Sequence, residues 1–103
     1  IKKFKYLEDV ILKNDLELEK PKLYNIIFYN DPITTTSFVI EVLKTIYKKT
    51  EHDAEEITNF IHFIGEGIVA TYPYEIAEQK IIETKKIIKS KGYPLKISFK
   101  PSC

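Results

Sequence analysis

The chain has 103 residues, of which 44% are hydrophobic, and its 16 basic and 15 acidic side chains leave a formal charge of +1. This length is enough for one domain with one core, and this composition excludes a disordered chain. Every basic residue is a lysine. The absence of arginine argues against a nucleic-acid-binding protein, because such proteins favour the bidentate guanidinium for base and phosphate contacts.

Residues 1–20 have the composition of an extension. Five lysines and five acidic residues alternate there with a few apolar side chains in a weakly helical pattern, which Pro21 ends. The sequence therefore predicts an N-terminal extension over 1–20 and a compact domain over 21–103. Because the chain begins at Ile1 and contains no methionine, we expect that an upstream segment was removed, together with any targeting peptide.

The first half of the domain predicts one strand and two helices. Apolar residues alternate over 24–29 as in a strand, and the Asn30-Asp31-Pro32 triplet that follows is typical of a turn. Thr34 is the expected N-cap of a helix that ends near residues 48–49. The pattern Thr50-x-x-Asp predicts the start of a second helix, which the glycines at 65 and 67 should end.

The second half predicts a strand, a helix and a strand. A β-branched run over 68–72 precedes Pro73, which suits the first position of a helix. Gly92 is a typical helix C-cap, and apolar residues alternate again over 95–99. The order β-α-α-β-α-β predicts a single α+β domain in which three helices cover one face of a small sheet.

The polar residues of greatest interest are Asn30 and Asp31 at the end of the first strand and His62 late on the second helix. An amide carbonyl, a carboxylate and an imidazole can together accept hydrogen bonds from one ammonium group. This set indicates a receptor for an amine that carries an apolar side chain. Two alternatives remain open from the residues alone: a simple turn at Asn30-Asp31, and a half-buried His62 bonded to a nearby carbonyl.

Several other classes of site lack support in the sequence. The second histidine, His52, is ten residues from His62, so we expect no metal site and no cofactor. The only cysteine is the terminal Cys103, and no G-x-S-x-G motif is present, so we expect no nucleophilic catalysis and no enzyme. No apolar run approaches the roughly 20 residues of a membrane span, so we expect no membrane partner.

The sequence resembles the ClpS family, the adaptors that hand N-degron substrates to a Clp AAA+ unfoldase–protease. The matching stretches are Pro21–Tyr24, Asn30-Asp31, Phe38–Leu43, Tyr74–Glu78 with Lys80, and Gly92–Leu95. The resemblance covers residues 21–99. It implies a sheet backed by three helices, a mobile N-terminal extension, no catalysis, and binding of proteins that begin with Leu, Phe, Tyr or Trp.

The resemblance also implies particular residues. Asn30, Asp31 and His62 correspond to the ligands of the substrate α-amino group. The substrate side-chain pocket corresponds to Thr34, Thr36, Val39, Thr58, Ile61 and Leu95. Glu75 and Lys80 correspond to contacts with the N-terminal domain of the unfoldase. Protonation of His62 would remove an acceptor, so we expect weaker binding in mild acid (the ordinary histidine pKa is about 6.5).

Three positions depart from the family pattern. Pro32 replaces the usual acidic residue, and Thr36 and Thr58 replace methionines at the pocket rim. The smaller side chains predict a wider entrance and weaker discrimination against β-branched first residues. The alternative function is a ribosomal-stalk-like protein-interaction domain, which needs neither Asn30-Asp31 nor His62. We expect a monomer in a bacterial cytoplasm or in the plastid stroma of an AT-rich, apicoplast-like lineage.

Overall fold

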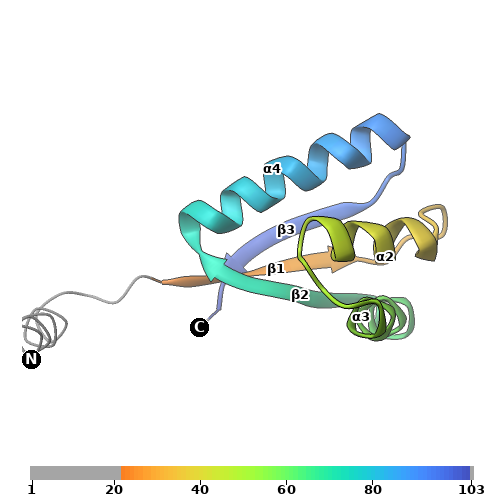
Figure 1. Cartoon of the computed structure of the whole chain (residues 1–103), viewed down its shortest axis with the longest axis horizontal. Coiled ribbons are helices and arrows are strands. Elements are labelled where there is room, and N and C mark those ends of the chain that lie inside the picture. The colour runs from red at the N-terminus through yellow and green to blue at the C-terminus, as the bar shows by residue number, and fades with distance from the viewer. Residues whose placement is uncertain (1–21, 103) are drawn as a thin grey trace, which may run out of the picture.

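The computed structural model describes residues 22–102, and within them the predicted order of strands and helices is confirmed (Figure 1). The elements are β1 (Leu23–Tyr29), α2 (Thr36–Thr45), α3 (Glu51–Ile64), β2 (Glu66–Pro73), α4 (Tyr74–Lys91) and β3 (Lys96–Pro101). The predicted extension over 1–20 lies outside the described residues. The fold class is α+β, as the sequence predicts.

The strands of the described chain form an antiparallel sheet in the order β2-β1-β3. On the central strand, Ile26 and Phe28 are fully buried beneath the helices, whereas Ile27 on the opposite face is only partly buried. The β1–β2 register shifts between Ile26 and Ile27, so that Val69 is an extra residue on β2 and is itself buried. This bulge bends β2 next to α3.

The helices divide the covered face between them. Helix α4 packs against all three strands, while α2 and α3 pack against each other and α3 also contacts β2. Figure 1 shows α4 running along the sheet, with α2 and α3 toward the end where β1 finishes. The buried Tyr47 hydroxyl lies 2.8 Å from Thr84 Oγ1 and links α4 to the end of α2. Burial raises the pKa of Tyr47 to about 12.

Helix α2 differs from its predicted bounds at both ends. Its N-cap is Thr35, whose Oγ1 accepts a hydrogen bond from the Phe38 amide at 3.2 Å, whereas Asp31 holds the Thr34 side chain in the preceding loop. The predicted N-cap, Thr34, is therefore wrong by one residue. The helix ends at Thr45 rather than near residues 48–49, because Lys48 adopts a left-handed conformation (φ 56°) and cannot continue it.

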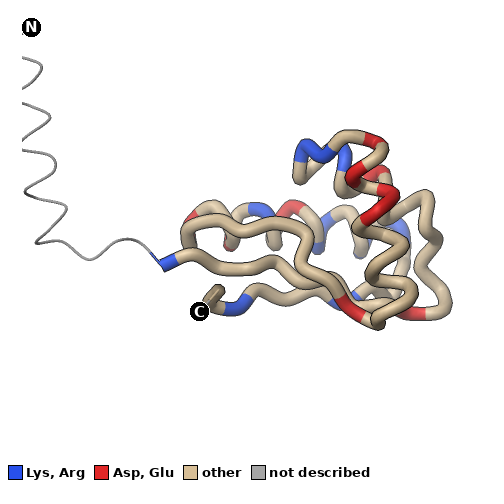
Figure 2. The backbone as a smooth tube through the Cα atoms, turned by 90° about the horizontal axis from the view of Figure 1, so that it is seen from below, with Lys and Arg blue, Asp and Glu red and all other residues tan. Residues whose placement is uncertain are grey.

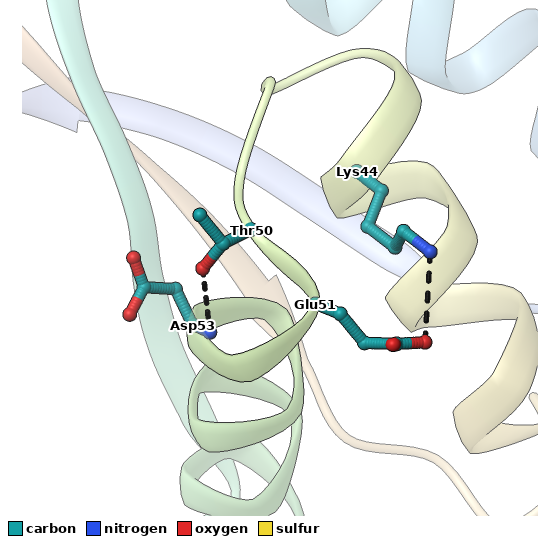
Figure 3. Close-up of polar contacts among 4 residues, drawn as sticks. All are labelled: Lys44, Thr50, Glu51 and Asp53. Carbon is teal, nitrogen blue, oxygen red and sulfur yellow. Dashed lines mark hydrogen bonds and ion pairs between the residues drawn. The ribbon is translucent and has the colours of Figure 1, made fainter.

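The junction between α2 and α3 confirms the predicted cap at Thr50 (Figure 3). Thr50 Oγ1 accepts from the Asp53 amide at 3.1 Å, and an exposed ion pair joins Lys44 Nζ to Glu51 Oε1 at 3.6 Å. The side-chain cap satisfies one of the amides that a helix start leaves free. Figure 2 shows that the acidic residues of α3 gather in its first half. The Thr50 cap sets where α3 begins, whereas the exposed ion pair contributes little to stability.

The end of α3 is set by two glycines with different roles. Gly65 caps the helix in the left-handed region (φ 106°), as predicted. Gly67 does not end the helix but lies within β2. A Cβ at that position would come within 2.9 Å of Ile61 Cγ1 and 3.1 Å of Phe60 Cδ1, so glycine permits α3 and β2 to approach closely.

The last helix and strand lie close to their predicted positions. Pro73 is the N-cap of α4 rather than its first helical residue, and Gly92 caps its end. Strand β2 extends beyond the predicted 68–72, and β3 begins one residue later than the predicted 95. The Lys80 ammonium donates to the Ile46 carbonyl at 2.8 Å. This bond satisfies a carbonyl at the end of α2 that has no partner within its own helix.

Candidate functional site

A cavity of about 390 Å³ opens where β1, the loop after it, α2 and α3 meet. We call it the amine cavity. It is lined by all nine residues that the sequence predicts for the α-amino and side-chain sites: Asn30, Asp31, Thr34, Thr36, Val39, Thr58, Ile61, His62 and Leu95. The structure thus brings together residues that lie up to 65 positions apart in the chain. Their role in binding stays a prediction.

Asp31 organises the loop between β1 and α2. Its Oδ1 accepts hydrogen bonds from the amides of Ile33 at 2.8 Å and Thr34 at 2.7 Å, and its Oδ2 accepts from the Thr34 hydroxyl at 2.6 Å. A carboxylate has about four acceptor sites, so one site on Oδ2 is free of these bonds. The loop therefore holds the carboxylate in a fixed orientation with capacity for one further donor.

These hydrogen bonds also determine the charge of Asp31. Partial burial raises the pKa of the carboxyl, but the hydrogen bonds from the Thr34 side chain and from the Thr34 and Ile33 amides outweigh burial, and the pKa lies below its ordinary value. Hydrogen bonding to the charged form favours that form. Asp31 is consequently ionised at neutral pH and can attract a cation.

A backbone bond joins this loop to the end of α3. The Asn30 amide donates to the Gly65 carbonyl at 2.8 Å. Because His62 lies in the last turn of α3, this bond brings the strand end and the helix end to the same side of the cavity. The two polar ends are thus positioned by main-chain geometry rather than by contacts between their own side chains.

The side chains of Asn30 and His62 are available to a ligand. Within residues 22–102, neither makes a hydrogen bond or an ion pair, and the His62 ring only contacts the edge of Phe63, with centroids 5.5 Å apart. His62 is exposed. The alternative of a half-buried histidine bonded to a carbonyl is therefore wrong, and both side chains can direct acceptors at an ammonium group.

The other end of the amine cavity is apolar. Val39, Ile61 and Leu95 are each less than 10% exposed. Thr58 is a buried wall residue rather than a rim residue, and its hydroxyl donates to the Ala54 carbonyl at 2.7 Å, so its proton is already used within α3. Thr36 is exposed at the start of α2. The cavity is therefore suited to a molecule with a cationic end and an apolar side chain.

Three further residues line the amine cavity: Phe28, Tyr29 and Pro32. The sequence marked Pro32 as a departure from the family pattern, whereas Phe28 and Tyr29 were not singled out as site residues. Phe28 and Tyr29 directly precede Asn30 at the end of β1. Their position next to Asn30 was the one sign in the sequence that they could line the cavity. Alternation along the strand instead assigned Phe28 to the core, where it is fully buried while still bordering the cavity.

The two predicted unfoldase contacts lie away from this cavity on α4. Glu75, in the first turn of α4, is exposed. Lys80 is half-buried, and its ammonium is bonded to the Ile46 carbonyl. Residues 22–102 contain no cluster of three or more side chains of the metal-ligating types, and no helix among them has the length and hydropathy of a membrane span.

Comparison with known proteins gives a consistent result. Residues 19–98 match the family model of the ATP-dependent Clp protease adaptor protein ClpS. The chain is 44% identical over 90 residues to the ClpS adapter of Clostridium acetobutylicum (87% of this chain, 89% of that protein) and 44% identical over 86 residues to that of Nautilia profundicola (84% and 89%). It also resembles the structure of Agrobacterium tumefaciens ClpS2 bound to L-phenylalaninamide, with TM-score 0.77 and 31% identity over 81% of this chain and 100% of that one.

Proposed function

The chain belongs to the ClpS family of Clp protease adaptors, and we propose that it binds the first residue of its substrates in the amine cavity and delivers them to a Clp AAA+ unfoldase. The chain acts as an adaptor and performs no chemistry of its own. Family membership supports this function over the ribosomal-stalk-like alternative. The relatives compared are bacterial, which supports a bacterial cytoplasm over the plastid stroma as the compartment.

The observation that carries the proposal is the pairing of unused acceptors with an apolar wall in one cavity. The substrate ammonium has three donors, and the Asn30 carbonyl, the free acceptor site of Asp31 and a ring nitrogen of His62 can receive them. Each charge-assisted bond contributes roughly 1.5–3 kcal/mol, and burial of a Leu or Phe side chain contributes a similar amount. After ordering costs, affinity near micromolar or somewhat tighter follows.

The apolar part of the cavity sets which first residues are accepted. Its wall of Val39, Ile61 and Leu95 suits Leu, Phe, Tyr and Trp side chains. The ligand of the Agrobacterium tumefaciens relative, an amide of phenylalanine, supports this choice because it combines a free amine with a large apolar side chain. Thr36 and Thr58 leave more space than methionine would, so Ile and Val are rejected less strongly.

Delivery uses a different surface. Glu75 is free to contact the N-terminal domain of the unfoldase, and residues 1–20 are expected to matter for delivery but not for binding the first residue. Lys80 has a structural role as well, through its bond to Ile46. A variant at Lys80 therefore tests docking only if its folding is measured in parallel.

The proposal is tested by fluorescence anisotropy with a peptide that begins with leucine or phenylalanine. We expect binding near micromolar when the amine is free and loss of binding when the amine is acetylated, because acetylation removes the charge and two donors. Triple alanine substitution of Asn30, Asp31 and His62 should give the same loss. Equal affinity for the free and acetylated peptides would overturn the proposal.

A further inference from the structure

A second cavity, of about 720 Å³, lies between α3 and β2. We call it the α3–β2 groove. Its apolar lining comes from Ile27 on β1, from Ile57, Phe60 and Ile64 on α3, and from Ile68 on β2. Phe60, Ile64 and Ile68 are 55%, 65% and 55% exposed. A group of large apolar side chains exposed side by side often marks a binding surface, whereas single exposed apolar residues are ordinary.

The charged residues that line the α3–β2 groove, or that lie one helical turn before its lining on α3, are acidic. Glu66 is the only charged residue that lines it among the described residues. Asp53 and Glu56 lie one helical turn before Ile57 and Phe60, on the same face of α3. No lysine of the described chain lines the groove, although lysine supplies all its basic residues. The groove is therefore complementary to a segment with aliphatic side chains and positive charges.

The α3–β2 groove adjoins the amine cavity at the end of α3. Ile61 lines the amine cavity, and the preceding residue, Phe60, lines the groove. Tyr29, which lines the amine cavity, pairs in the sheet with Glu66, which lines the groove. The Asn30 amide is bonded to the Gly65 carbonyl between them. The two cavities therefore lie on either side of the segment from Phe60 to Glu66, so a peptide held in the amine cavity has to cross only this segment to enter the groove.

We propose that the α3–β2 groove binds the residues that follow the first residue of the same substrate, and that it prefers aliphatic residues accompanied by lysine or arginine. The inference rests on the proposed function, since the first residue must occupy the amine cavity for the next residues to lie here. The adaptor would then select substrates by a short sequence and not only by their first residue.

The preference is measured with peptides that share leucine, glycine and serine as their first residues. One continues with alternating isoleucine and lysine, a second replaces the lysines with glutamates, and a third replaces the isoleucines with serines. We expect the first peptide to bind about tenfold more tightly than either of the others, which corresponds to about 1.4 kcal/mol. Equal affinities for the three peptides would overturn the proposal.

Variants assign the effect to the groove. Phe60→Ser and Glu66→Lys change exposed residues, so the fold should persist, and each should remove the advantage of the isoleucine–lysine peptide. Ile82→Ser, an exposed isoleucine on α4, is the matched control and should change nothing. Glu66→Lys should in addition favour the glutamate peptide.

Binding of phenylalaninamide separates this proposal from the proposed function. If phenylalaninamide binds equally to all variants while the peptides show no preference, only the groove proposal fails. If phenylalaninamide does not bind at all, both proposals fail. Sedimentation velocity provides a further check: a dimer that forms with the wild type and is lost in Phe60→Ser would identify the groove as a self-association surface and would overturn its assignment to substrate.

Discussion

The amine cavity and the α3–β2 groove share the end of α3 but are built in opposite ways. In the amine cavity, Asp31 is held by three hydrogen bonds of 2.6–2.8 Å. In the groove, Phe60 and Ile64 are more than half exposed, and the only charged lining residue in the described chain is Glu66. We expect the first to recognise one group by geometry and the second to accept a range of segments by composition.

The substitution Asp31→Asn tests recognition in the amine cavity most directly. The asparagine carbonyl can still accept from the Ile33 and Thr34 amides, so the loop should persist, but the negative charge is lost. Loss of one charge-assisted bond should weaken binding of a leucine-initiated peptide roughly tenfold to hundredfold. Anisotropy measures the affinity, and thermal melting monitors the fold.

The control for this variant is Glu75→Gln, which removes an exposed carboxylate on α4 without touching the amine cavity. Its peptide affinity should equal that of the wild type. Unchanged affinity in Asp31→Asn would mean that the fixed carboxylate does not contact the amine.

The apolar end of the amine cavity is tested by competition between peptides that differ only in their first residue. Isoleucine-initiated peptides should bind less than about a hundredfold worse than leucine-initiated ones, a difference below about 2.7 kcal/mol. Thr36→Met should narrow the entrance and increase this ratio several-fold. Thr45→Met, at the other end of α2, is the control. A wild-type ratio above a hundredfold would contradict the wider entrance.

The imidazole at the shared end of α3 predicts a pH dependence. Histidine is the side chain whose charge ordinarily changes between pH 5 and 8, and a protonated His62 would lose its acceptor and repel the ammonium. Peptide affinity should fall several-fold from pH 8 to pH 5 in the wild type and much less in His62→Asn. His52→Asn, an exposed histidine paired with Glu56, should keep the full dependence. A flat wild-type titration would exclude His62 as a ligand.

The smallest expected effect is on stability in acid. The pKa of Asp31 is lowered in the folded chain from its ordinary value of 3.8, so its carboxylate stabilises the fold above that pH, and this contribution is lost as the pH falls through the folded value. Chemical unfolding at pH 5 and pH 3 should show a smaller loss of stability in Asp31→Asn than in the wild type. An equal loss of stability in the two proteins would show that other carboxylates account for the destabilisation in acid.

The order of elements was predictable because each has a local signal, such as Thr50 at a helix start and Gly65 at a helix end. Competition between neighbouring side chains was not predictable: Asp31 engages Thr34, which moves the helix cap to Thr35. The early end of α2 was also hidden, because Lys48 gives no sign of its left-handed conformation.

In the candidate site, too, some features were predictable from the sequence and others were not. The sequence resemblance predicted the residues around the amine cavity, whereas the exposure of His62 and the bond from Lys80 to Ile46 depend on contacts between distant elements. Ile64 follows Ile57 and Ile61 at helical spacing, but it is 65% exposed at the edge of the groove. Periodicity identifies an apolar face and does not tell whether another element covers it.

The central claim is that the amine cavity recognises a free α-amino group. The most direct measurement is the change in amide chemical shifts of the isotope-labelled protein on addition of phenylalaninamide or its N-acetyl derivative. The free amine should shift the amides of Asn30, Thr34 and His62 and leave Ile68 unchanged, and the acetylated compound should shift none of them. Equal shifts with both compounds, or shifts confined to other surfaces, would contradict the claim.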